Sequence, residues 1–122
     1  MKVLFDHNVP HKLRAELLAF GRHEIVTASH LGWTLLRNGE LLQRAEQAGF
    51  DAFVTGDRSL VDEQNLTLRR LAVLVLSTNN WPILRANWQE VLQAIDQASP
   101  GSVRRVDCGE FRPGVRPNRR PD

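Results

Sequence analysis

The 122-residue sequence has a single cysteine and no long apolar run. Cys108 cannot form a disulfide within the chain, so we expect a reducing, cytoplasmic location. No apolar stretch approaches the roughly 20 residues that a membrane-spanning helix needs, which predicts that the membrane is not a partner. The apolar start of the chain is interrupted at Asp6 and is too short for the core of a secretory signal.

A large net charge of either sign is also absent from most of the chain. The formal net charge is +2, and residues 1–99 carry ten Lys/Arg against eleven Asp/Glu. Residues 100–122 carry six Arg against three acids, so the basic character comes from the C-terminal end. This composition favours a polyanionic partner such as RNA, although a solvated terminus explains it equally well. We expect one domain over residues 1–107 and a basic Arg/Pro/Gly-rich flexible tail over residues 108–122.

Short apolar segments alternate with helical periodicity along the domain. Strands are predicted at residues 2–5, 23–26, 51–54, 71–76 and 102–106. Helices are predicted at residues 10–21 and 38–49, within 59–65, and over the apolar positions from 84 to 95, after a turn at 79–82. This alternation predicts an α/β fold, with helices on both faces of a central parallel sheet of four or five strands. Ligands of such sheets bind beyond the carboxyl ends of the strands.

Acidic residues fall at that edge of the predicted sheet. The first strand leads into Asp6, the third leads through Thr55 to Asp57, and Glu40 lies in the first turn of a helix that begins at the same edge. Three converging carboxylates would repel one another without a cation. Oxygen ligands select a hard ion, so the sequence predicts a Mg²⁺ or Mn²⁺ site of the kind that polarises phosphodiesters and activates water.

Each of these residues also has a structural interpretation. Asp57 can cap the short helix that follows it, and Glu40 can complement the dipole of its own helix. Asn38, which precedes Glu40, is predicted to be the N-cap of that helix.

Two basic residues lie beside the acids in the sequence. His7 follows Asp6 and is a candidate for contact with a substrate phosphate. Arg58 is suited to stabilising phosphate charge, but a surface ion pair with Asp62 or Glu63 explains it equally well.

Three ordered motifs carry a resemblance to a known family. They are LFDHN at residues 4–8, NGELLQRA at residues 38–45 and FVTGD at residues 53–57. In order and spacing they resemble the Asp-x-Asn opening, the acidic helix and the apolar-Thr-x-Asp strand end of compact prokaryotic PIN-like proteins. Many of these are catalogued only as domains of unknown function, and they are related to VapC-type toxins. The resemblance covers about residues 2–80.

The resemblance implies a three-layer α/β/α PIN-like fold, a Mg²⁺ or Mn²⁺ cofactor and endoribonuclease activity on RNA. Activity of this type is often neutralised by a protein antitoxin, and dimerisation into a homodimer is a further expectation from the family. Carried over by position, Asp6 and Asp57 would bind the metal. Asn8 would orient a carboxylate or a water, and Thr55 would support the site through its hydroxyl.

Two departures from the family pattern leave a second hypothesis open. The helix-start aspartate of the family falls on the neutral Asn38, with Glu40 as the candidate substitute. Residues 27–37 contain no acid, where larger PIN nucleases carry a glutamate. We therefore predict a metal-dependent ribonuclease, with a catalytically degenerate module that binds nucleic acid or a protein partner as the alternative. Haloacid-dehalogenase-like phosphatases are disfavoured, since they need an aspartate where Asn8 stands.

Overall fold

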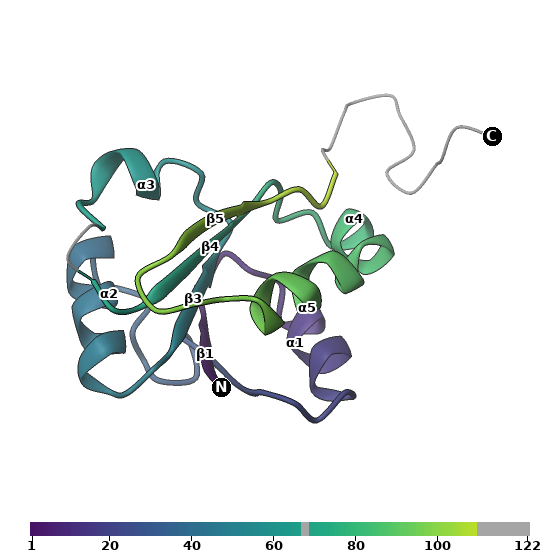
Figure 1. The fold of residues 1–122 in the computed structure, drawn as a ribbon, viewed down its shortest axis with the longest axis horizontal. Coiled ribbons are helices and arrows are strands. Elements are labelled where there is room, and N and C mark those ends of the chain that lie inside the picture. Colours follow the sequence, from purple (N-terminus) through teal and green to yellow (C-terminus); the bar gives the residue numbers. More distant parts are fainter. Residues whose placement is uncertain (67–68, 110–122) are drawn as a thin grey trace.

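The computed structural model describes residues 1–66 and 69–109 (Figure 1). Five strands form one sheet in the order β2-β1-β3-β4-β5, and every neighbouring pair is parallel. The strands are β1 (Lys2–Phe5), β2 (Glu24–Thr27), β3 (Ala52–Thr55), β4 (Ala72–Leu76) and β5 (Val103–Val106). The predicted α/β fold with a central parallel sheet is confirmed, and the sheet has five strands.

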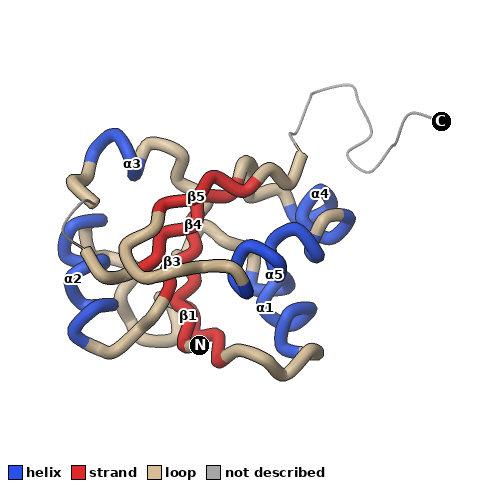
Figure 2. Tube along the Cα trace, in the orientation of Figure 1, coloured by secondary structure: helices blue, strands red, loops and turns tan. Residues whose placement is uncertain are grey.

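Helices cover both faces of this sheet and complete a three-layer α/β/α arrangement. Figure 2 shows α1, α4 and α5 on one side of the red strands and α2 and α3 on the other. The helices are α1 (His11–Leu18), α2 (Asn38–Gln47), α3 (Leu60–Glu63), α4 (Trp81–Ala86) and α5 (Trp88–Asp96). In the described part of the chain, no helix has the length and apolar character that a membrane span requires.

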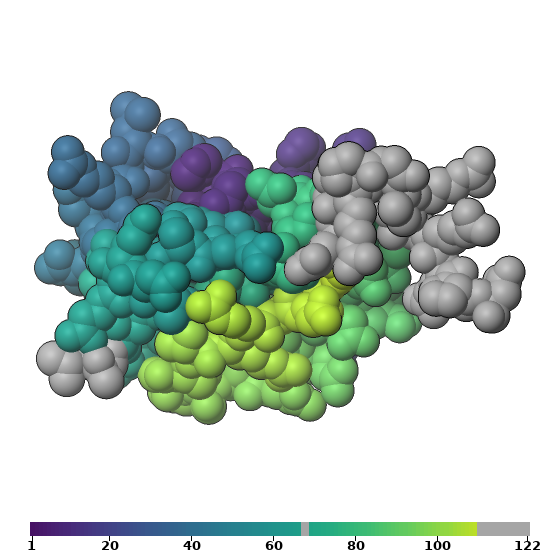
Figure 3. All heavy atoms as spheres, turned by 90° about the horizontal axis from the view of Figure 1, so that it is seen from above, coloured from purple at the N-terminus to yellow at the C-terminus, as the bar shows by residue number. Residues whose placement is uncertain are grey.

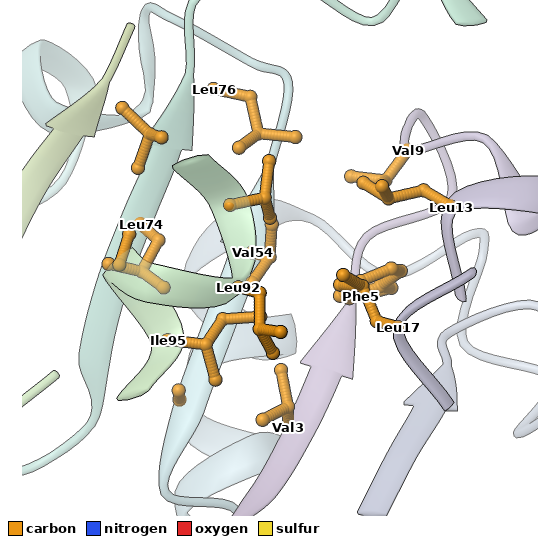
Figure 4. Close-up of a cluster of buried hydrophobic side chains, with 14 of the residues drawn as sticks. Val3, Phe5, Val9, Leu13, Leu17, Val54, Leu74, Leu76, Leu92 and Ile95 are labelled. Carbon is orange, nitrogen blue, oxygen red and sulfur yellow. The ribbon is translucent and has the colours of Figure 1, made fainter. Parts of the chain in front are cut away.

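The core consists of two apolar clusters, one on each face of the sheet. Successive residues of a strand point to opposite faces. Val3 and Phe5 therefore pack in a cluster with Leu13 of α1 and Ile95 of α5 (Figure 4), while Leu4 packs in the cluster on the α2 side. All five residues of β4 are buried, which explains the unbroken aliphatic run at this point of the sequence.

The single helix predicted across residues 84–95 is wrong, because the chain forms two helices that meet at Asn87. The Asn87 side chain donates to the Ile83 carbonyl (2.8 Å) and so competes with helix continuation. The first of the two helices also begins within the predicted turn, since Asn80 accepts the Ile83 N–H (3.2 Å) as an N-cap. Both helices pack against the same face of the sheet, so the apolar periodicity continues across the break.

Cys108, which the sequence assigned to the tail, is buried against the end of the sheet. Its N–H donates to Ser77 Oγ (2.9 Å), and that hydroxyl donates to the Gly109 carbonyl (2.7 Å). Burial raises the pKa of the Cys108 thiol to about 11, so the thiol is protonated at neutral pH and is unsuited to act as a nucleophile. The remainder of the predicted tail, residues 110–122, lies outside the described residues.

Candidate functional site

Asp6 and Asp57 follow two strands that are direct neighbours in the sheet. β1 and β3 run parallel with Phe5 beside Val54, and the Asp6 N–H continues this ladder by donating to the Val54 carbonyl (2.9 Å). Asp57 follows two residues after β3 ends at Thr55. Both aspartates therefore lie at the carboxyl edge of the sheet, where ligands of parallel sheets bind.

The Thr55 hydroxyl connects the two aspartates. Thr55 is fully buried, and its Oγ1 donates to Asp6 Oδ2 (2.8 Å). The same oxygen accepts the backbone N–H of Asp57 (3.0 Å). One hydroxyl thus fixes the carboxylate of the first aspartate and the backbone of the second.

The Asp6 carboxylate is buried, with 2% of the residue exposed. Its Oδ1 accepts the His7 backbone N–H (2.8 Å) and lies 2.9 Å from His7 Nδ1. Its Oδ2 accepts from Thr55 and, at 3.4 Å, from the Asn8 amide. A buried carboxylate requires such partners, so these contacts hold Asp6 in one orientation.

Asn8 joins the loop after β1 to the end of β3. Besides its contact with Asp6, its amide lies 3.5 Å from Thr55 Oγ1, and its Oδ1 accepts the Gly56 N–H (2.9 Å). A Cβ atom on Gly56 would lie 3.2 Å from Asn79 Cβ and 3.4 Å from Asn8 Oδ1, so this position accommodates glycine best. Asn79, which is exposed after β4, therefore extends the site to a third strand end.

Asp57 is partly exposed and is held by different contacts. Its Oδ1 accepts the Ser59 hydroxyl (2.6 Å) and the Ser59 N–H (3.0 Å), an Asx-type turn that leads into α3. Its Oδ2 accepts the Asn38 amide (3.1 Å). These hydrogen bonds, with the Ser59 hydroxyl first, lower the pKa of Asp57 below its ordinary value of 3.8 despite partial burial, so the group is ionised at neutral pH.

The prediction that Asn38 is the N-cap of its helix is wrong. Arg37 occupies that position with an extended backbone, and Asn38 is the first residue of α2. The Asn38 side chain points to Asp57 instead of the helix backbone. A neutral amide thus lies beside the second aspartate, where the family resemblance leads one to expect an acid.

The predicted convergence of three carboxylates is not found, because Glu40 does not join the two aspartates. Two residues along an α-helix correspond to a rotation of about 200°. Since Asn38 faces Asp57, Glu40 is directed to the opposite side of α2, and it is exposed. Within residues 1–66 and 69–109, no group of three His, Cys, Asp or Glu side chains is placed to hold a metal ion.

The two basic side chains predicted for substrate contact are both exposed. The His7 side chain is 55% exposed beside Asp6. Arg58 is exposed directly after Asp57, and among the described residues it forms no ion pair with Asp62 or Glu63. A hollow of about 170 Å³ adjoins the first aspartate, and its lining includes Asp6, His7, Asn8, His11, Thr27 and Ser29.

The structural alternative for Asp57 anticipated a contact with the start of the following helix, but it did not identify Ser59 as the partner. An aspartate followed two residues later by serine, just before a short helix, is typical of an Asx-type turn. Thr27 and Ser29, on the wall of the hollow, carried no comparable signal, because their nearness to Asp6 depends on β2 pairing with β1.

The oxygen donors of this site suit a hard divalent ion better than a soft one. Mg²⁺ is commonly held by one or two protein carboxylates, with water and substrate phosphate completing its shell. Asp6 and Asp57 supply that number of carboxylates without a third acid. The donor set therefore fits one ion held by two carboxylates, rather than a pair of ions.

Comparison with known proteins finds no match to this chain among protein-family models, curated proteins or solved structures. The resemblance to PIN-like proteins accordingly depends on the three sequence motifs.

Proposed function

We propose that the protein is a metal-dependent endoribonuclease of the PIN-like type. The observation that carries the proposal is the Thr55 hydroxyl, which holds the Asp6 carboxylate and the Asp57 backbone at one sheet edge. The lowered pKa of Asp57 supports it as well, since an ionised carboxylate is needed to bind a cation at neutral pH. The ribonuclease would be the toxin of a toxin–antitoxin pair, a role that the resemblance implies.

Asp6 and Asp57 would hold a Mg²⁺ or Mn²⁺ ion. Such an ion polarises a phosphodiester and activates water for its hydrolysis. Asp6 would be the fixed ligand, because its buried carboxylate is held by Thr55, His7 and Asn8. Asp57, which is partly exposed, would adjust to the ion.

The residues around the two aspartates would position the RNA. Arg58 and His7 are exposed beside them and would contact the phosphates that flank the scissile bond. Asn8 and Thr55 would act as positioning residues, because each bonds to Asp6 and to the loop after β3.

The direct test is cleavage of a single-stranded RNA oligonucleotide by the purified chain with Mn²⁺ or Mg²⁺. We expect Asp6→Asn and Asp57→Asn each to lower the rate by more than about 100-fold, because loss of even an outer partner of a metal ligand costs roughly 10- to 100-fold. Asp51→Asn is the matched control, since Asp51 directly precedes β3 and so lies at the amino-terminal end of the strand, away from the site. Cleavage that persists in both site variants, or in EDTA, would refute the proposal.

A catalytically degenerate module that binds RNA or a protein partner is the second candidate. The Asn38 amide favours it, because this neutral group occupies one oxygen of Asp57. In that case the natural chain binds RNA without cutting it, and Asn38→Asp creates metal-dependent cleavage. Under the first proposal the natural chain already cleaves, and Asn38→Asp raises the rate. Asn38→Ser, which adds no charge, is the control for both.

A further inference from the structure

The two edges of the sheet differ in how their backbone groups are bonded. β2 and β5 each have one neighbouring strand, so half of their N–H and C=O groups point away from the sheet. On β2 these groups belong to Ile25 and Thr27, because the N–H groups of Glu24 and Ala28 donate to carbonyls on the β1 side.

The outward carbonyls of β2 are both occupied by the chain itself. Arg14 of α1 donates its Nε to the Ile25 carbonyl (2.6 Å). The Leu31 N–H donates to the Thr27 carbonyl (3.3 Å). Because both outward carbonyls are already engaged, pairing of another strand with this edge is disfavoured.

Among the described residues, no strand or side chain occupies the β5 edge. Val73 N and Ser77 N donate to the carbonyls of Ser102 and Val106, so alternation directs the backbone groups of Val103 and Arg105 outward. Within residues 1–66 and 69–109, these outward groups have no hydrogen-bond partner. Figure 3 shows the yellow-green atoms of this part of the chain at the molecular surface.

The side chains along this edge combine an apolar and a cationic group on one face of the sheet. Val103 is 42% exposed, and Arg105 is exposed two residues later. The alternate residues are already engaged on the other face, where Arg104 donates to Gln97 Oε1 (2.8 Å) and Val106 is buried in the core. Among the described residues, Arg105 forms no ion pair.

We propose that β5 is the docking edge for an extended segment of a partner protein, which adds a sixth strand to the sheet. The segment would carry an apolar side chain beside Val103 and a carboxylate beside Arg105. Its backbone would bond to the outward groups of these two residues, as in strand addition to a sheet edge. This proposal does not depend on the nuclease activity, because it concerns a different part of the molecule.

The charge of the edge selects this occupant over a second copy of the chain. An antiparallel β5–β5 pair whose two-fold axis passes through Arg104 or Arg105 would set that arginine of one copy directly opposite the same arginine of the other copy. Like charges that are directly opposite in a sheet destabilise the pair. An acidic segment removes this repulsion and replaces it with attraction.

The test begins with a fluorescent eight-residue peptide that alternates valine and glutamate, measured by anisotropy with the full chain. The control peptide carries lysine in place of glutamate. We expect saturable binding of the acidic peptide and at least roughly tenfold weaker binding of the basic one. Absence of saturable binding, or equal binding of the two peptides, would overturn the proposal.

Variants of the chain then locate the binding site. Val103→Pro removes an outward N–H, and Arg105→Glu reverses the edge charge. Each should weaken binding of the acidic peptide about tenfold or more, whereas Arg85→Glu on the exposed surface of α4 should leave it unchanged. Loss of single-stranded RNA binding in Arg105→Glu, with peptide binding intact, would instead assign the edge to RNA and refute the proposal.

Amide hydrogen exchange distinguishes strand addition from a purely ionic contact and requires no variant. The amides of Val103 and Arg105 should exchange quickly in the free chain and slowly with saturating acidic peptide. The amide of Arg104 points toward β4 and serves as the internal control, since peptide binding should change it least. Bound peptide with no added protection at Val103 and Arg105 would contradict the docking mode.

Discussion

The two aspartates of the candidate site differ in the surroundings that the fold gives them. Asp6 directly follows a strand, is 2% exposed and bonds to three residues, namely His7, Asn8 and Thr55. Asp57 lies in a loop, is partly exposed and bonds mainly to Ser59. The difference indicates that a buried network specifies the position of one carboxylate, while a local turn keeps the other ionised and accessible.

The largest expected effect is on stability and compares the two acids directly. Asp6→Ala leaves the buried Thr55 hydroxyl without the carboxylate that accepts its hydrogen bond, and should lower the free energy of unfolding by about 1–3 kcal/mol. Asp57→Ala exposes its former partners to water and should cost less than about 1 kcal/mol. Urea denaturation measures both. Equal costs would show that the burial difference has no energetic consequence.

The next effect concerns the link between the two acids. Thr55→Val preserves the shape of the side chain but removes the hydroxyl that bonds to Asp6 and to the Asp57 N–H, and should cost about 1–2 kcal/mol. Thr55→Ser retains the hydroxyl and should recover most of the cleavage activity that Thr55→Val loses. A valine variant with natural stability and activity would mean that the hydroxyl does not connect the acids.

The smallest expected effect is on pH dependence at Asp57. Ser59→Ala removes the hydrogen bond that contributes most to lowering the pKa of Asp57, and should cost about 0.5–1 kcal/mol at neutral pH. A lowered pKa stabilises the fold above the unfolded value near 3.8, and this stabilisation is lost as the pH falls through the lower folded value.

The difference in unfolding free energy between Ser59→Ala and the natural chain should therefore be present at pH 7 and diminish below pH 3.8. Carboxyl titration by NMR should also show a higher pKa for Asp57 in the variant. A difference that stays constant across this range would assign the effect to helix α3 instead of the carboxylate.

The sequence was sufficient to place Asp6 and Asp57, because strand ends are marked by polar residues and parallel strands share their carboxyl edge. It was insufficient for Glu40, since the direction of a helical side chain depends on the exact start of the helix. The prediction placed that start on Asn38 as N-cap, whereas Arg37 has this role. Asn38 is therefore already inside the helix, and its side chain bonds to Asp57. Glu40, two residues later on the helix, then faces away from Asp57.

The break at Asn87 was hidden for a different reason. Asn87 stands between two apolar stretches that pack on the same face of the sheet, so the periodicity predicts one helix where there are two. Only the bond from its side chain to the Ile83 carbonyl reveals the interruption. The role of Thr55 as a link between the acids likewise required the register of β1 against β3.

The most direct measurement is a Mn²⁺ titration of the purified chain, followed by electron paramagnetic resonance. We expect one bound ion per chain, loss of that ion in Asp6→Asn and in Asp57→Asn, and unchanged binding in Glu40→Gln. A chain that binds no Mn²⁺, or binds it equally well without either aspartate, would contradict the claim that these two side chains share one ion.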